Sequence, residues 1–174
     1  GYQRETVSAW QETQNQALRS LAALAAEVAQ RHPEAHVVVR PHPFERSETY
    51  RLLLPRLSNL ELASEGTVDR WIIPASAVVQ RSCTTAIEAC LAGVPALSPR
   101  FIPILPEMES AEAVSIGCST PEELHEHLDA ALVGSLVIPE AQQLALDRVG
   151  HDWLGFSDGR AHERVAARLL DASE

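Results

Sequence analysis

Residues 77–97 read AVVQRSCTTAIEACLAGVPAL and contain a complete strand, turn, helix and second strand. The apolar run from Ala77 predicts a buried strand, and the hydroxyl-rich turn after it is typical of a helix start. Gly93 ends the predicted helix, because glycine often terminates helices, and Pro95 cannot continue it. The next apolar residues predict a second strand. This order favours an α/β fold with a parallel sheet.

The turn of this unit carries three hydroxyl side chains, Ser82, Thr84 and Thr85, and Glu88 follows one helical turn later. The first turn of a helix has free N–H groups and a partial positive charge, which suit a phosphate. Glu88 is close enough to the same end of the helix to accept hydrogen bonds from a sugar hydroxyl. We therefore predict a nucleotide-binding turn. The alternative is that the hydroxyls only cap the helix and that Glu88 pairs with a neighbouring arginine.

Composition and charge exclude several classes of protein. The chain has 174 residues, 45% of them apolar, which predicts one compact domain over residues 1–174. A net charge of −10 argues against a nucleic-acid partner, because binding phosphate backbones needs clustered basic side chains. No apolar run is long enough for a membrane span. Three cysteines without metal-ligand spacing indicate a reduced, cytoplasmic protein without a metal site. Because the chain starts at Gly1 rather than at a methionine, we expect it to be part of a longer protein.

Strands and helices alternate along the rest of the chain. Predicted helices cover residues 6–31, 48–57, 68–73, 120–131, 139–148 and 157–170, and predicted strands cover residues 36–40, 60–62 and 114–117. Residues 98–110 contain several prolines and no hydrophobic period, so we expect a loop there. Strands that are apolar on both faces are typical of a parallel sheet with helices on both sides. The sequence thus predicts a Rossmann-like fold of three layers, α/β/α.

A second loop of interest follows the predicted strand at residues 36–40. Arg40-Pro41-His42-Pro43 places a cation and an imidazole beside two prolines that fix the backbone. In parallel α/β folds, ligands bind at the carboxyl ends of the strands, where this loop and the turn at residues 81–85 both lie. We expect Arg40 and His42 to contact a nucleotide. The alternative is a proline-bounded turn in which His42 only caps nearby carbonyl groups.

Three further features have structural rather than catalytic interpretations. His125 and His127 lie two positions apart on a predicted helix, so they point to different faces, which favours a surface location over a metal site. Trp10 is expected in the core. The acidic side chains of Glu107 and Asp129 are expected on a solvent-exposed face.

Six motifs follow one another along the chain: VVVRPHP at 37–43, EGTV at 65–68 with Trp71 after it, RSCTTAIEA at 81–89, GVP at 93–95, HDW at 151–153 and DGRA at 158–161. Their order resembles bacterial surface carbohydrate biosynthesis proteins, a family that is similar to the carboxyl-terminal half of a GT-B glycosyltransferase. The His42-Pro43 pair is also similar to the motif with which bacterial sialyl- and Kdo-transferases contact a cytidine nucleotide.

The resemblance implies the nucleotide-sugar-binding half of a glycosyltransferase for surface or capsular polysaccharide. Its donor would be CMP- or UDP-linked, its acceptor a glycan, and no other cofactor is expected. The implied contacts run from His42 to the nucleotide, from Ser82, Thr84 and Thr85 to the phosphate and from Glu88 to a ribose or sugar hydroxyl; Glu65, Thr67 and Arg81 are further candidates for the cleft. No catalytic residue is assigned. A GT-B enzyme takes its base from an amino-terminal domain, so we expect the isolated chain to be inactive.

Two other interpretations stay open. The first is a half-domain of UDP-N-acetylglucosamine 2-epimerase type or of a CDP-glycerol glycerophosphotransferase, both of which share the two-domain architecture and a similar turn followed by a carboxylate. A cytidine preference would favour Kdo-like or CDP-linked donors, and a uridine preference would favour the epimerase. The second is a non-catalytic nucleotide-binding or interaction module. In each case we expect contact with the inner membrane only through the rest of a longer protein.

Overall fold

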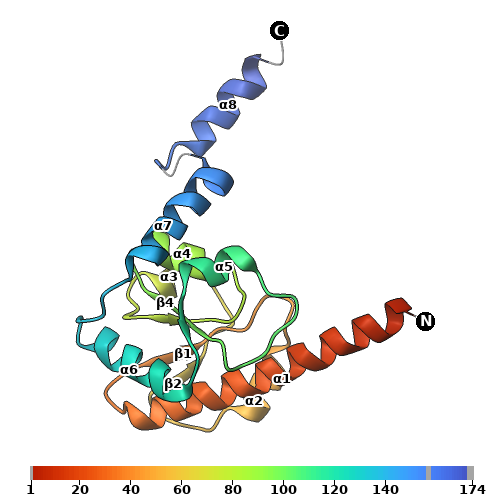
Figure 1. Ribbon diagram of the computed structural model, residues 1–174, viewed down its shortest axis with the longest axis vertical. Coiled ribbons are helices and arrows are strands. Elements are labelled where there is room, and N and C mark those ends of the chain that lie inside the picture. The colour runs from red at the N-terminus through yellow and green to blue at the C-terminus, as the bar shows by residue number, and fades with distance from the viewer. Residues whose placement is uncertain (1, 156–157, 172–174) are drawn as a thin grey trace.

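The computed structural model of the protein describes residues 2–155 and 158–171 (Figure 1). It begins with α1 (Tyr2–Arg31), a single helix that ends just before His32 and Pro33. Ala17 and Leu24 of this helix are buried, whereas its amino-terminal turns extend beyond the packed body. Trp10 lies on this extension and is 46% exposed, so its predicted place in the core is wrong.

Five short strands form two sheets in which all pairing between described residues is parallel. β1 (Val37–Val39) pairs with β2 (Leu60–Leu62), and β4 (Ala96–Pro99) lies between β3 (Val78–Val79) and β5 (Ile116–Cys118). Val78 is opposite Ala96, so the two strands of the 77–97 unit pair as predicted. The predicted α/β class is confirmed, and the arrangement is compatible with a Rossmann-like fold.

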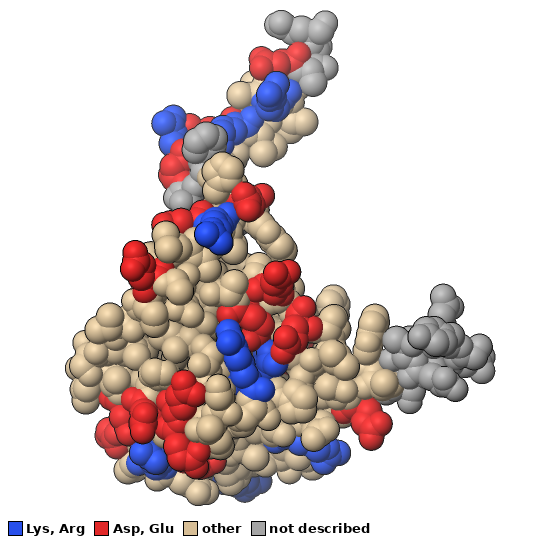
Figure 2. Space-filling view, in the orientation of Figure 1, with Lys and Arg blue, Asp and Glu red and all other residues tan. Residues whose placement is uncertain are grey.

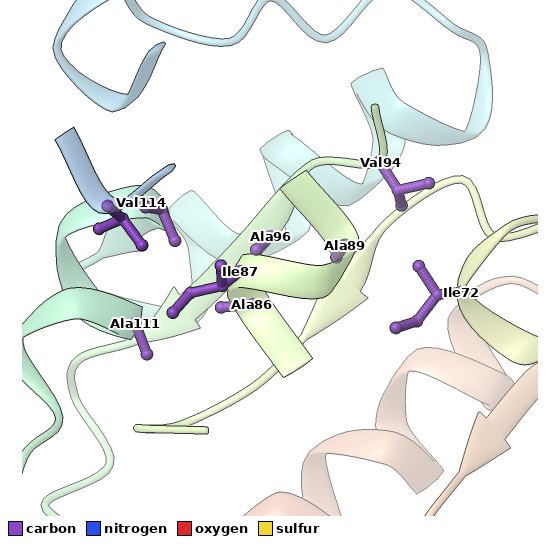
Figure 3. Packing of buried hydrophobic residues seen from close by; sticks show 9 residues of the cluster. Ile72, Ala86, Ile87, Ala89, Val94, Ala96, Ala111 and Val114 are labelled. Carbon is purple, nitrogen blue, oxygen red and sulfur yellow. The ribbon is translucent and has the colours of Figure 1, made fainter. Parts of the chain in front are cut away.

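Helices cover the three-stranded sheet on both faces. On one face, α1 and α6 (Pro121–Leu132) bury Leu24, Leu124 and Leu128 against Leu97 of β4. On the other face pack α3 (Asp69–Ile72), α4 (Thr85–Leu91), α5 (Glu109–Val114) and α7 (Glu140–Val149), while α2 (Ser47–Leu53) connects β1 to β2. Figure 3 shows the buried side chains of α4 between those of its neighbours, and the labelled residues are Ile72, Ala86, Ile87, Ala89, Val94, Ala96, Ala111 and Val114.

Small side chains let α4 approach the sheet closely. Ala86 and Ala89 are three positions apart, both are fully buried, and both pack in the same cluster as Ala96 of β4. Gly93 follows the helix with a φ of 77°, the left-handed conformation that a terminating glycine adopts readily. The predicted end of α4 at Gly93 is therefore confirmed. The small side chains of α4 pack directly against the sheet.

The segment between β4 and β5 differs from the sequence prediction. Residues 98–110 were expected to form a loop, but β4 continues to Pro99 and α5 begins at Glu109. Val114 ends α5 and is buried, so the predicted strand at 114–117 is displaced to β5. The six residues of α5 are fewer than two helical turns, which is too short for a helical period to show in the sequence.

The contact between α1 and α6 corrects one further prediction. The side chain of His125 is only 5% exposed, and its Nε2 lies 2.9 Å from Oε1 of Glu27. The predicted surface location of His125 is therefore wrong, because the packing of α1 against α6 covers it. Asp129 is 47% exposed, as predicted, and accepts a hydrogen bond of 3.1 Å from Arg31 at the end of α1.

The carboxyl-terminal helices form an arm that projects from the body (Figure 1). α7 passes into a π-helical turn, η1 (Gly150–Leu154), and α8 (Ala161–Asp171) follows without a buried side chain. The predicted start of the last helix at residue 157 lies outside the described residues. No helix in the described ranges has the length and apolar character needed to span a membrane.

Candidate functional site

The turn that follows β3 is fixed by buried polar side chains. Gln80 is buried; its Oε1 accepts a 2.7 Å hydrogen bond from the amide of Cys83, and its Nε2 donates to Ser115 at 3.0 Å. Ser82 has a φ of 54°, a left-handed conformation that costs a non-glycine residue about 1–2 kcal/mol. Surrounding hydrogen bonds must therefore hold this backbone in place.

Glu112 of α5 supplies most of those hydrogen bonds. Its Oε1 accepts from the Ser82 amide at 2.9 Å, from the Ser82 hydroxyl at 3.1 Å and from Nη1 of Arg81 at 2.6 Å. Its Oε2 accepts from the Ser98 hydroxyl at 2.7 Å. Burial raises the pKa of this carboxyl, but the hydrogen bonds and the Arg81 charge outweigh burial, so the net pKa is below its usual value. Glu112 is thus an ionised carboxylate that fixes the turn.

Arg81 is the cation of this network, and each nitrogen of its guanidinium group has a partner in the protein. Its side chain is 3% exposed, and its Nε donates to the carbonyl of Ile102 at 2.8 Å. Nη1 pairs with Glu112, and Nη2 pairs with Glu107, whose side chain is 55% exposed, as predicted, although it contacts Arg81. The structure places Arg81 beside the predicted site, where it braces the turn.

The amides of Thr84 and Thr85 differ from those of Ser82 and Cys83. The Ser82 and Cys83 amides bond to Glu112 and Gln80, whereas within the described residues no partner is found for the Thr84 and Thr85 amides. The Thr84 side chain is exposed and makes no cap, and the half-buried Thr85 has its hydroxyl 3.1 Å from Sγ of Cys83. Two consecutive amide donors without a partner thus lie at the carboxyl end of β3, beside an exposed threonine.

Glu88 lies on α4 one turn beyond these donors. Its side chain is exposed, and no ion pair to it is found among the described residues. The alternative in which Glu88 pairs with a neighbouring arginine finds no support in this arrangement.

The loop after β1 is organised separately. Nη1 and Nη2 of Arg40 donate to the carbonyls of Glu65 and Gly66 at 3.2 and 2.6 Å, which ties this loop to the one after β2. The His42 amide donates to Oε2 of Glu45 at 2.7 Å, and the exposed His42 ring lies 5.1 Å from the ring of Phe44. Nδ1 of His42 accepts from the Phe44 amide at 3.3 Å. His42 thus presents its ring to solvent from a braced turn.

The two remaining cleft candidates lie on the loop after β2. Glu65 contributes its carbonyl to Arg40, and its side chain is exposed. The exposed Thr67 contacts Asp69, and the hydrogen bond from its hydroxyl is the main reason why the pKa of Asp69 lies below its usual value. Thr67 therefore stabilises the start of α3.

The predicted site residues thus form two groups at the carboxyl ends of strands in different sheets. Arg40, His42, Glu65 and Thr67 belong to the β1–β2 sheet, and Arg81, Ser82, Thr84, Thr85 and Glu88 belong to the β3–β4–β5 sheet. Sequence reasoning missed the residues that hold the second group, above all Glu112 and Gln80. Glu112 carried no signal because α5 was not predicted.

Comparison with known proteins adds no further constraint. No protein-family model matches the chain, and no curated protein or solved structure matches it either. In residues 2–155 and 158–171, no group of histidine, cysteine, aspartate or glutamate side chains is arranged to hold a metal ion.

Proposed function

We propose that this chain binds a nucleotide-sugar through the turn at Thr84 and Thr85. In this proposal it is the donor-binding half of a GT-B-like glycosyltransferase for surface polysaccharide, as the sequence resemblance implies. The single observation that carries the proposal is the pair of unpartnered amides of Thr84 and Thr85, set beside two hydroxyls in a turn whose Ser82 and Cys83 amides are satisfied.

The geometry suits a phosphoryl group for two reasons. First, phosphate oxygens accept several hydrogen bonds at once, and consecutive backbone amides are donors with a fixed direction. Second, Glu112 and Gln80 hold the turn before any ligand binds, so little conformational entropy is lost on binding. Such donors would stabilise the negative charge that develops on the nucleotide phosphate as it leaves the sugar.

The other two residues of the proposal act at the edges of the nucleotide. The exposed imidazole of His42 would contact the nucleotide from the loop after β1, and Glu88 would accept hydrogen bonds from ribose or sugar hydroxyls. A net charge of −10 opposes the binding of any anion, so we expect weak affinity, with a Kd of about 1 mM for a free nucleotide.

Titration of the ¹⁵N-labelled chain with CMP, CDP, UDP and GDP, followed by NMR, tests the proposal. We expect one nucleotide to shift the amide signals of Thr84 and Thr85 first. Thr84→Val, His42→Ala and Glu88→Ala should each weaken binding by about tenfold, the loss expected for one hydrogen bond to a charged group.

Glu126→Ala is the matched control for Glu88→Ala, because Glu126 is an exposed glutamate on α6, which covers the opposite face of the sheet. It should leave nucleotide binding unchanged. If none of the four nucleotides shifts the signals of residues 82–88, the proposed site is wrong.

A further inference from the structure

A depression of about 560 Å³ opens between α1 and the segment that follows β4. Its volume lies within the range of small-molecule sites, about 300–1,000 Å³. The residues that line it are Thr13, Gln16, Arg81, Arg100, Pro103, Ile104, Leu105 and Glu107. Of these residues, only Arg81 and its partner Glu107 belong to the network described above.

Arg100 is held in the depression by the backbone beneath it. Its Nη2 donates to the carbonyl of Glu112 at 3.3 Å, and its side chain remains 50% exposed. Gly117 of β5 makes room for it, because a Cβ at this position would overlap the guanidinium group. The guanidinium therefore lies over the strand with part of its surface open to a ligand.

The charges around the depression balance. Two guanidinium groups, those of Arg81 and Arg100, are matched by the carboxylates of Glu107, in the lining, and of Glu112, beneath it. Figure 2 shows a small group of basic side chains bordered by acidic ones near α5. A free anion would meet the two carboxylates and a cation would meet the two guanidinium groups, so neither ligand is favoured.

The groups that remain available are both donors and acceptors of hydrogen bonds. The Thr13 hydroxyl donates to the carbonyl of Ala9 at 2.9 Å, which leaves its oxygen free to accept, and the exposed Gln16 amide can do both. One wall of the depression is apolar and consists of Pro103, Ile104 and Leu105. The Leu105 carbonyl is fixed by a 2.9 Å hydrogen bond from Gln14.

We propose that this depression binds a neutral sugar unit, whose hydroxyls would bond to Arg100, Gln16 and Glu107 while its C–H face covers the apolar wall. The proposal rests on the proposed function for the source of that sugar. Arg81 joins the two sites, since it lines the depression and its Nη1 lies 3.4 Å from the Ser82 hydroxyl of the phosphate turn.

Gly117→Ala provides a test that changes the position of the Arg100 guanidinium group without removing any charged residue. The added methyl group displaces only the far end of the long Arg100 side chain, so the fold should survive, and thermal unfolding will verify this. We expect glucose and N-acetylglucosamine to shift the amide signals of Gln16, Leu105 and Gly117 in the native protein. Gly117→Ala and Gln16→Ala should each weaken this binding by about tenfold.

Gln11→Ala is the matched control for Gln16→Ala, because Gln11 is exposed on the same helix and does not line the depression. Titration with UDP-glucose identifies the source of the sugar. If the depression binds the donor sugar, UDP-glucose should shift the Gln16 and Thr84 signals together. If it binds the acceptor sugar, a free sugar should still bind when the turn is saturated with nucleotide.

Two results would overturn the proposal. In the first, neither sugar shifts these signals at about 100 mM, far above the Kd of a weak site. In the second, acetate or inorganic phosphate shifts them and the sugars do not, which would make the depression an anion site. The signals of Thr84 and Thr85 report on nucleotide binding, whereas those of Gln16, Leu105 and Gly117 report on sugar binding. Each of the two proposals can therefore be refuted without the other.

Discussion

Replacing Glu112 by glutamine keeps the size of the side chain and removes the charge that holds the turn after β3. The native carboxylate accepts four hydrogen bonds, three at Oε1 and one at Oε2. A glutamine amide has only one oxygen, so at least one of Arg81, Ser82 and Ser98 would face an NH₂ group, which donates and cannot accept. The substitution also leaves Arg81, only 3% exposed, with a single carboxylate partner.

The expected loss can be worked out from these contacts. Removing one partner from a buried ion pair costs about 3–5 kcal/mol. Glu107 still pairs with Arg81, although its side chain is 55% exposed, so we place the loss at the lower end, about 3 kcal/mol. In a chain of this size, that loss lowers the melting temperature by about 6–12 °C.

Urea unfolding of the native protein and of Glu112→Gln at neutral pH measures this loss. Glu109→Gln is the matched control, because Glu109 is exposed on the same helix. Since the pKa of Glu112 is below its usual value, its stabilisation is complete at neutral pH and is lost as the pH falls through that lowered pKa. The two proteins should therefore converge in acid. A loss below about 1 kcal/mol at neutral pH, or an equal loss in the control, would refute the reasoning.

Three further substitutions test separate features of the structure. Ser82→Ala should lower the free energy of unfolding by about 1–3 kcal/mol, because it removes the hydroxyl that bonds to Glu112 and Met108. Ser82→Gly removes the same hydroxyl but relieves the left-handed backbone, so its loss should be about 1 kcal/mol smaller. Equal losses for the two variants in urea unfolding would contradict this. Burial raises the pKa of the Cys118 thiol to about 12 in the folded protein, whereas its ordinary value is 9.0. As the pH rises above 9.0, this thiol therefore ionises in the unfolded chain but not in the folded one. The free energy of unfolding should then fall by about 1.4 kcal/mol per pH unit until the folded thiol also ionises. Cys118→Ala should remove this part of the alkaline slope, and an unchanged slope would count against it. His125→Leu should change the free energy of unfolding by less than about 1 kcal/mol. The substitution removes a buried Nδ1 that has no partner, and it leaves Glu27, which is half-exposed, in contact with water. A loss above about 2 kcal/mol would show that the ion pair matters more than the packing.

The sequence predicted the fold class because the relevant signals are local. The β-branched residues at 37–39, the capping Thr120 and the terminating Gly93 each determine structure within a few residues, and each lies where it was expected. The short helix α5 could not be predicted in this way. Its place depends on the contact of Glu112 with Arg81, 31 positions away, and no local pattern encodes such a contact.

The candidate site likewise combines features that are local in the sequence with features that depend on contacts between distant residues. Thr84 and Thr85 could be proposed from the sequence because a hydroxyl-rich turn before a helix is a local pattern. Arg81 was placed in the cleft from its position beside that turn, yet the residues that neutralise it come from a distant segment. The structure also shows that the Arg40 guanidinium is engaged by two carbonyl groups, which leaves His42 as the more exposed residue of its loop.

The overlap that a side chain at Gly117 would make with Arg100 has an evolutionary consequence. Among related sequences, a residue larger than glycine at position 117 should appear only where position 100 carries a shorter side chain than arginine. A neutral residue at position 112 should likewise accompany the loss of Arg81, because either change alone removes one half of a buried ion pair. Each of the two pairs of positions would then change as a unit.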